Sequence, residues 1–173
     1  VQGHCSVNAI PSMKQHTYEF AYEVYEDITQ LNEADAALLR QARIVTAKAY
    51  APYSKFNVGA AALLANGEIL LGTNQENASY PVGICAERVL LGTAATLHPD
   101  IAIISMAISC NTAKEKSNHP ISPCGMCRQS LLEYETRFKH PIRLIMGGME
   151  GKIHVVEAAR QLLPFAFTGE ELI

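Results

Sequence analysis

The chain has 173 residues, of which 49% are hydrophobic and 18% are charged, and its formal net charge is −3. A chain of this size and composition can bury a core of its own as one compact domain. Its negative charge offers no basic surface for a run of phosphates, which argues against a nucleic-acid partner. No stretch approaches the roughly 18–20 apolar residues of a membrane span, and no secretory signal is visible. We therefore expect a cytoplasmic protein with no membrane partner.

The first element is expected at residues 17–24, where apolar and polar residues alternate. The apolar positions of this alternation are Tyr18, Phe20, Tyr22 and Val24. A period of two predicts a strand with one buried face. Further on, Asn32 precedes Glu33 and Asp35, which is typical of a helix N-cap followed by an acidic first turn. The Ala- and Leu-rich residues 36–50 then predict a helix of about four turns.

The centre of the chain predicts a β-hairpin. Residues 57–65 and 68–74 are rich in small or β-branched side chains, and Asn66-Gly67 between them is a strong signal for a tight turn. The remaining elements are expected as a helix over residues 85–97, a strand over 101–110, a helix over 124–138, and strands over 142–147 and 153–156.

This order of elements predicts an α/β fold, namely a three-layer α/β/α sandwich with a central mixed β-sheet. We expect residues 1–16 to form a flexible N-terminus and residues 17–173 to form a single domain. The polar stretch of residues 111–120 is expected to be a mobile loop.

The spacing of the cysteines is more informative than their number. Five is an odd count, and without a visible secretory signal it favours a reducing compartment over disulfides. Cys124 and Cys127 lie at the start of a predicted helix, where both thiols can face one metal ion. Taken alone, this pair fits a zinc half-site, a redox dithiol or two packed cysteines about equally well. Cys85 begins another predicted helix 39 residues before Cys124, and three thiolates from two helix starts make an open zinc site.

An open zinc site is a reactive one. Three protein ligands leave one tetrahedral position for water, and bound zinc lowers the pKa of that water from about 15.7 towards roughly 7–9. Three thiolates leave the site formally at −1, so we expect the helix N-termini and the adjacent Arg88 to compensate this charge. Glu87 follows the ligand Cys85 by two residues and is expected to face the open position as the general acid–base group.

Other residues offer less specific interpretations. A fourth ligand such as His119 would close the site and make the zinc structural, but it would leave Glu87 without a purpose. Cys110 ends an apolar run and is expected to be a small buried residue. Cys5 lies in the loose N-terminus and is expected to have no role in the site.

These motifs resemble those of a known family. Cys85-Ala86-Glu87 with Pro123-Cys124-Gly125-Met126-Cys127 is similar to the zinc deaminase signature in its version with Cys as the first ligand. Longer segments resemble the small homotetrameric zinc-dependent cytidine deaminases. These segments are residues 53–61, residues 72–81, Arg128-Gln129, and Leu162-Leu163-Pro164 with Phe167. The resemblance covers roughly residues 38–172.

The resemblance implies roles for individual residues. Asn74 and Glu76 match the pair that grips the ribose 3′-hydroxyl, and Phe56 matches the aromatic residue that lines the nucleoside pocket. The backbone of Ala86 and the side chain of Glu87 match the groups that read the pyrimidine edge.

The resemblance also implies a homotetramer with shared active sites. Ala78, Tyr80 and Phe167 match residues that reach into the site of a neighbouring subunit. The chain departs from the family pattern at Thr73, where a Cys is common, and in residues 17–24, which extend the N-terminus relative to the shortest members.

The implied function is hydrolytic deamination of cytidine and deoxycytidine, a reaction of pyrimidine salvage, with one Zn²⁺ per chain. Water attacks C4 of cytosine while Glu87 moves protons to the ring and to the departing amine. The alternatives are a deaminase of the same fold that acts on a blasticidin-type antibiotic or on a base in nucleic acid, and a non-enzymatic module stabilised by zinc.

Overall fold

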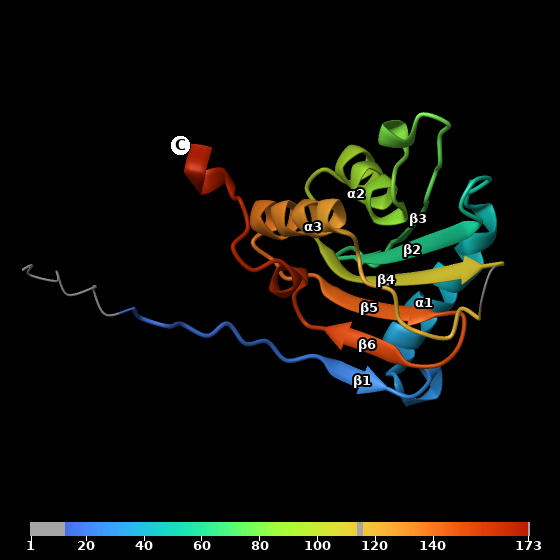
Figure 1. The fold of residues 1–173 in the computed structure, drawn as a ribbon, viewed down its shortest axis with the longest axis horizontal. Coiled ribbons are helices and arrows are strands. Elements are labelled where there is room, and N and C mark those ends of the chain that lie inside the picture. Colours follow the sequence, from blue (N-terminus) through green and yellow to red (C-terminus); the bar gives the residue numbers. More distant parts are fainter. Residues whose placement is uncertain (1–12, 114–115, 173) are drawn as a thin grey trace, which may run out of the picture.

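The structure, a computed structural model, describes residues 13–113 and 116–172. Within these residues six strands form one sheet, and helices cover both of its faces (Figure 1). The elements are β1 Glu23–Tyr25, α1 Glu33–Val45, β2 Phe56–Leu64, β3 Ile69–Thr73, α2 Ala86–Leu97, β4 Ile103–Thr112, α3 Gly125–Phe138, β5 Arg143–Gly148 and β6 Ile153–Val156. Short 3₁₀ helices lie at Ile28–Gln30, Thr46–Lys48, Tyr80–Val82, Ala159–Leu162 and Gly169–Leu172.

The sheet has the strand order β1-β6-β5-β4-β2-β3. β4 and β5 run parallel, and the other neighbouring strands run antiparallel. α1 packs against one face of the sheet, while α2 and α3 lie side by side on the other (Figure 1). The expected three-layer α/β/α sandwich with a mixed sheet is therefore confirmed.

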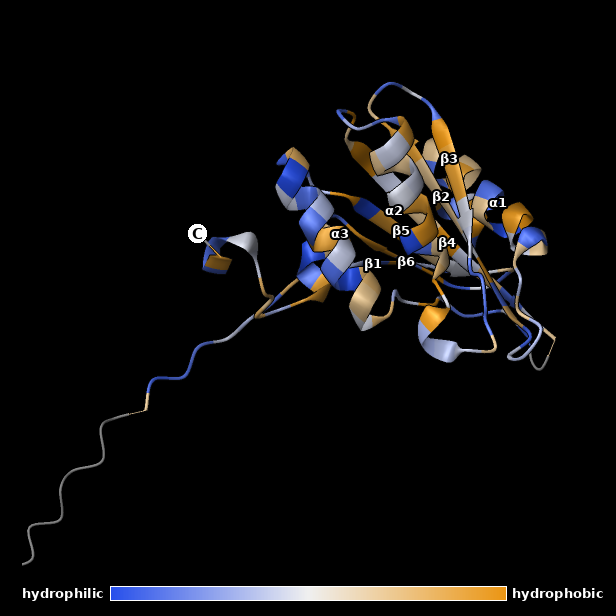
Figure 2. Ribbon diagram, turned by 90° about the horizontal axis from the view of Figure 1, so that it is seen from above, coloured by the Kyte–Doolittle hydropathy of each residue, from blue (hydrophilic) through white to orange (hydrophobic). Residues whose placement is uncertain are grey.

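Each face of the sheet has its own hydrophobic core, because strand side chains point alternately to the two faces. The core beneath α1 contains Leu39, Ala107 and Ile145, and the core beneath α2 and α3 contains Leu90, Met106, Leu131 and Leu144. Figure 2 shows the strands as hydrophobic segments between the helices. A fully buried aliphatic side chain of this kind contributes roughly 1.5–3 kcal/mol.

Gly72 in β3 allows α2 to begin directly on the sheet. A Cβ atom at this position would lie 2.5 Å from the Ala86 carbonyl oxygen and 2.9 Å from the Leu90 backbone nitrogen. Such distances exclude any larger residue without a shift of the helix. The start of α2, with Cys85 as its N-cap, is thereby held against the sheet.

The local signals for α1 and for the hairpin are confirmed. Asn32 is the N-cap of α1, and its side chain accepts a hydrogen bond of 2.9 Å from the Asp35 backbone N–H. Regular α-helix ends at Val45 and continues as a 3₁₀ turn to Lys48. Gly67 has a φ of +87°, which the tight turn between β2 and β3 requires.

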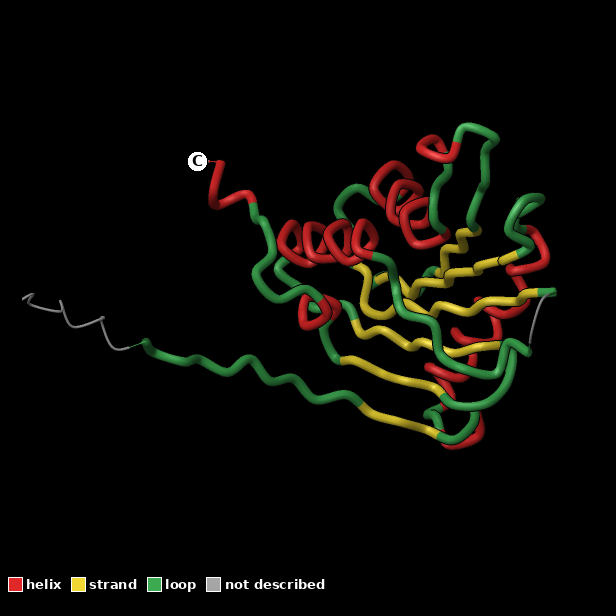
Figure 3. Tube along the Cα trace, in the orientation of Figure 1, coloured by secondary structure: helices red, strands yellow, loops and turns green. Residues whose placement is uncertain are grey.

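The expected strand over residues 17–24 was wrong in length and in burial. The structure has a strand at Glu23–Tyr25, and residues 13–22 before it form an extended loop (Figure 3). The partner strand β6 has four residues, and beyond it the chain turns towards the helix Ala159–Leu162. The ladder therefore ends at Glu23, and the alternating side chains upstream remain exposed. These exposed side chains are Tyr18, Phe20 and Tyr22, with Val24 in the strand itself.

The expectations for Cys5 and for most of the flexible N-terminus concern residues 1–12, which lie outside the described residues. In the loop expected at residues 111–120, Asn111 and Thr112 still belong to β4, and Ser117 is buried with its hydroxyl accepting from the Thr112 N–H at 3.0 Å. Within residues 13–113 and 116–172, none of the helices is both long and apolar enough to cross a lipid bilayer.

Candidate metal centre and active site

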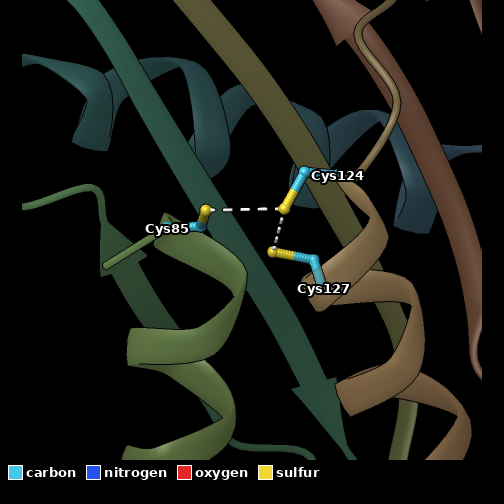
Figure 4. A group of neighbouring side chains, drawn as sticks. All are labelled: Cys85, Cys124 and Cys127. Atoms are coloured by element: carbon cyan, nitrogen blue, oxygen red, sulfur yellow. Dashed lines mark hydrogen bonds between the residues drawn. The ribbon is translucent and has the colours of Figure 1, made fainter. Parts of the chain in front are cut away.

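Cys85, Cys124 and Cys127 converge at the starts of α2 and α3, with their sulfur atoms turned towards one another (Figure 4). The Sγ atoms of Cys85 and Cys124 lie 3.7 Å apart, and those of Cys124 and Cys127 lie 3.5 Å apart. All three sulfur atoms lie within 4.8 Å of one another. The structure thus brings together the three residues predicted to hold the metal.

The two helix ends present these thiols because of their local backbone. Cys85 and Cys124 are N-caps with extended φ and ψ, and neither side chain caps its own helix. Their sulfur atoms are therefore available to the neighbouring helix. The approach to α3 is fixed by Arg128, whose Nε donates to the Pro123 carbonyl at 2.9 Å.

The charge state of the cluster also favours a cation. Hydrogen bonding from Cys127 lowers the pKa of Cys85 to about 6, and Cys124 and the charge of Arg88 act in the same direction. The same hydrogen bond raises the pKa of Cys127, since this thiol keeps its proton for the neighbouring thiolate. A divalent cation among the sulfur atoms removes the need for that shared proton.

The cluster has the dimensions of a zinc site. Zinc–sulfur bonds of about 2.3 Å in a tetrahedral arrangement separate two sulfur atoms by roughly 3.8 Å, close to the two sulfur–sulfur distances given above. Among the described residues, His119 is not part of the cluster, so the structure gives no support for the closed site with that fourth ligand. The donor set fits one zinc ion with an open position.

Glu87 lies in the first turn of α2 and lines the same cavity as Cys85 and Cys124. It is 4% exposed, and its burial raises the pKa of its carboxyl group. A carboxyl group that exchanges protons more easily near neutral pH is suited to general acid–base chemistry.

The cavity beside the thiol cluster has a volume of about 690 Å³. It is lined by Ser54, Phe56, Val58, Asn74, Gln75, Glu76, Gly83, Ile84, Cys85, Ala86, Glu87, Ile121, Ser122 and Cys124. The structure therefore gathers Phe56, Asn74, Glu76 and Ala86 around one cavity with Glu87, although these residues come from different elements.

Asn74 and Glu76 have structural contacts that the sequence did not indicate. The Asn74 side chain accepts from the Val58 N–H at 2.7 Å and donates to the Phe56 carbonyl at 2.9 Å. The Glu76 carboxylate accepts from the backbone N–H of Tyr53 at 2.9 Å. A hydrogen bond from the Ser54 side chain lowers the pKa of Glu76, so this group is a carboxylate at neutral pH. Both residues thus hold the walls of the cavity.

The remaining predicted site residues lie outside this cavity. Ala78, Tyr80 and Phe167 are exposed, Tyr80 to 76% and Phe167 to 58%. Tyr80 instead borders a smaller hollow of about 390 Å³ that shares Glu76 with the cavity. Arg88 borders a separate hollow between α2 and α3.

Two further residues were missed as parts of the site. Ser54 lies in the cavity wall, inside a motif that the sequence singled out without a role for this side chain. Arg128 links the loop that ends at Pro123 to the C-terminal segment, because its Nη1 also donates to the Leu162 carbonyl at 3.0 Å. Its position directly after Cys127 was the available signal.

A three-layer α/β/α sandwich with an open three-cysteine cluster and a buried neighbouring glutamate defines the class of zinc-dependent deaminases. The family model described as the cytidine and deoxycytidylate deaminase zinc-binding region matches residues 32–139. The chain belongs to this family.

Individual relatives cover most of the chain. A cytidine deaminase of Halalkalibacterium halodurans is 35% identical over 135 residues, which are 78% of this chain and 95% of the relative. A cytidine deaminase of Sporosarcina psychrophila is 36% identical over 135 residues, which are 78% of this chain and 92% of the relative. The crystal structure of cytidine deaminase from Burkholderia pseudomallei is similar with a TM-score of 0.67 and 36% identity, and the match covers 79% of this chain and 100% of that one.

Proposed function

We propose that the chain hydrolyses cytidine and deoxycytidine to uridine and deoxyuridine with release of ammonia, and that it serves pyrimidine salvage. The observation that carries this proposal is the single cavity that joins the thiol cluster, Glu87 and a set of polar and aromatic groups suited to a nucleoside. Its volume of about 690 Å³ is in the range of small-molecule sites. The relatives named above as cytidine deaminases support the choice of substrate.

The chemistry divides between the metal and the chain. Cys85, Cys124 and Cys127 would hold the zinc ion, which would lower the pKa of a water molecule and so supply the nucleophile. Glu87 takes a proton from the attacking water and gives it to N3 of the ring. It then moves the second proton to the departing amine, so that cytidine and water become uridine and ammonia. The low exposure of Glu87 keeps these transfers away from bulk solvent.

The other cavity residues position the nucleoside. Phe56 offers an apolar surface to the pyrimidine ring, and the Ala86 backbone reads its edge. Asn74 and Glu76 bind the sugar hydroxyl, for which the ionised Glu76 is an acceptor without a proton of its own. A phosphate ester at that hydroxyl would meet a like charge and leave the carboxylate without its donor.

We also propose a homotetramer in which Ala78, Tyr80 and Phe167 complete the site of a neighbouring subunit. The exposure of these three side chains supports this arrangement. A cytoplasmic location is proposed with it, since three clustered thiols need a reducing compartment to remain free ligands. Residues 17–173 are proposed as the domain that assembles in this way.

The substrate assignment is tested by kcat/KM for cytidine, deoxycytidine, blasticidin S, adenosine and a cytosine-containing oligonucleotide. Cytidine and deoxycytidine should both react, since nothing in these motifs rejects the loss of the 2′-hydroxyl. Blasticidin S and the oligonucleotide should react far more slowly, because their sugar positions do not offer the free hydroxyl, and adenosine should be inert in a pocket for one ring. Faster turnover of the antibiotic or the oligonucleotide than of cytidine would overturn the assignment.

A further inference from the structure

The two helix starts that carry the thiols differ in what holds the chain before them. Ile84, directly before Cys85, exchanges two backbone hydrogen bonds with Gln75, at 2.9 and 3.0 Å. Among the described residues, no backbone–backbone hydrogen bond involves residues 118–123, which lead into Cys124. The approach to Cys124 therefore lacks the kind of pairing that holds the approach to Cys85.

Cys124 also lacks the usual restraint of a helix start. An N-cap residue ordinarily binds the first turn of its helix with its side chain, but the Cys124 thiol makes no such hydrogen bond. Its sulfur atom lies instead 3.7 Å from that of Cys85 and 3.5 Å from that of Cys127. Because this side chain faces the metal site, another group has to hold the backbone of Cys124.

Arg128 holds the backbone on both sides of Cys124. Its backbone N–H donates to the Cys124 carbonyl at 2.9 Å, and its side-chain Nε donates to the Pro123 carbonyl at 2.9 Å. These two carbonyl groups flank the Cα atom of Cys124, so they fix the direction in which its thiol leaves the chain. Pro123 is buried, and the Arg128 side chain is the partner of its carbonyl among the described residues.

The guanidinium group of Arg128 has a fixed support at its other end. Its Nη1 donates at 3.0 Å to the carbonyl of Leu162, which ends the 3₁₀ helix Ala159–Leu162. The buried Glu135 of α3 accepts from the Ala159 N–H at 2.8 Å and so ties this 3₁₀ helix to the same α-helix. A planar guanidinium with several donors in a rigid fork can bind two separate carbonyls, whereas a lysine ammonium is a single point on a flexible stem.

We propose that Arg128 is a positioning residue for the metal: it holds the backbone at Cys124 so that this thiol faces the other two, and it thereby raises the affinity of the site for zinc. Arg128 acts through Cys124 and does not touch the metal. Residues that orient metal ligands in this way typically contribute roughly 10- to 100-fold in metal affinity. This role rests on the metal assignment and not on the choice of substrate.

The test measures the zinc dissociation constant by competition with a chelating dye. Arg128→Ala should weaken zinc binding by roughly 10- to 100-fold. Arg128→Lys should weaken it by about fivefold or more, because one ammonium group cannot hold both carbonyls. The matched control is Arg137→Ala at the other end of α3, which also removes a hydrogen bond to a proline carbonyl, that of Pro99 at 2.7 Å. The zinc affinity of this control should stay within about twofold of wild type.

Cobalt(II) bound in place of zinc reports on the position of the thiolates, because its visible absorption depends on the coordination geometry. At saturating cobalt, Arg128→Ala should show an altered spectrum, while Arg137→Ala should match the wild type. A variant that had only lost stability would keep the wild-type spectrum. The thermal unfolding midpoint is measured for each variant, and Arg128→Lys carries both measurements if Arg128→Ala does not fold.

A zinc affinity of folded Arg128→Ala within threefold of wild type, or an unchanged cobalt spectrum, would overturn the role of Arg128. Wild-type affinity in Arg128→Lys would overturn it as well, since positive charge alone would then be sufficient. Equal losses in Arg128→Ala and Arg137→Ala would reduce the effect to the general stability of α3. Wild-type protein that binds no zinc would refute the metal assignment itself, and cytidine turnover enters none of these outcomes.

Discussion

Cys85, Cys124 and Cys127 all lie at helix starts, where backbone N–H groups and the helix dipole favour negative charge. Spacing alone predicted this cluster and the neighbouring Glu87, because each of these residues lies close in sequence to a helix start. The contact between Ser54 and Glu76 could not be predicted in the same way. It depends on a turn that brings together residues 22 positions apart, on the two sides of the β2–β3 hairpin.

The metal assignment predicts a difference between two cysteine variants. Cys124→Ser should lose most of its zinc, since the hard hydroxyl is a poor replacement for a thiolate. Cys110→Ser is the matched control, because Cys110 is buried in β4 and is not part of the thiol cluster. It should keep about one zinc per chain by elemental analysis of the purified protein. Equal zinc in both variants would show that the metal is held elsewhere.

Among the elements, helix α3 connects the loop that ends at Pro123, just before the ligand Cys124, with the C-terminal segment. Arg128 holds the Pro123 and Leu162 carbonyls, and Gln129 donates to the Phe167 carbonyl at 2.9 Å. Further along the helix, Glu135 is fully buried, and its Oε1 accepts from the backbone N–H groups of Ile142 and Ala159.

The periodic spacing of hydrophobic residues predicted the helices and the central strands well, because the burial of one face of an element is encoded in its own residues.

The N-terminal strand shows where that local signal fails. Tyr18, Phe20 and Tyr22 alternate as a half-buried strand would, but a strand also needs a partner that runs beside it. The partner β6 ends at Val156, so the alternation continues without a ladder. The length of the pairing between β1 and β6 is set by β6, so residues 17–24 alone could not predict it.

Replacing Glu135 by Gln should destabilise the fold strongly. An amide nitrogen in place of one carboxylate oxygen would face N–H donors, either those of Ile142 and Ala159 or the Arg160 Nε, which now donates at 2.7 Å. We expect a loss of roughly 2–4 kcal/mol in the free energy of unfolding. Chemical denaturation of this variant is compared with that of Glu133→Gln, an exposed position of the same helix that should change by less than about 0.5 kcal/mol. Similar denaturation midpoints for the two variants would argue against a stabilising role for the hydrogen bonds of Glu135.

Tyr80 and Phe167 are exposed in the single chain, and the proposed tetramer predicts that they become buried at a subunit interface. The proposed tetramer has a mass of about 76 kDa, four times the 18.9 kDa of the chain, and light scattering measures it directly. An active monomer would refute the proposal.

The proposed sharing of active sites between subunits predicts a result that mixing two variants can test. Phe167→Ala should keep its zinc but lose at least tenfold in kcat/KM, since each site lacks the side chain from its neighbour. When these subunits are reassembled with inactive Glu87→Gln subunits, some sites combine an intact Glu87 with an intact neighbouring Phe167, so activity should rise above that of either variant. No gain in reassembled tetramers would mean that each chain completes its own site.

We expect the zinc-loaded protein to deaminate cytidine with Glu87 as the proton carrier. The most direct measurement is the formation of uridine and ammonia from cytidine by the wild-type enzyme and by Glu87→Gln, with the zinc content of both determined. We predict one ammonia per uridine from the wild type, and a rate at least about 10²-fold lower for Glu87→Gln at unchanged zinc. Zinc-loaded wild type that forms no uridine, or a Glu87→Gln rate within tenfold of wild type, would contradict the claim.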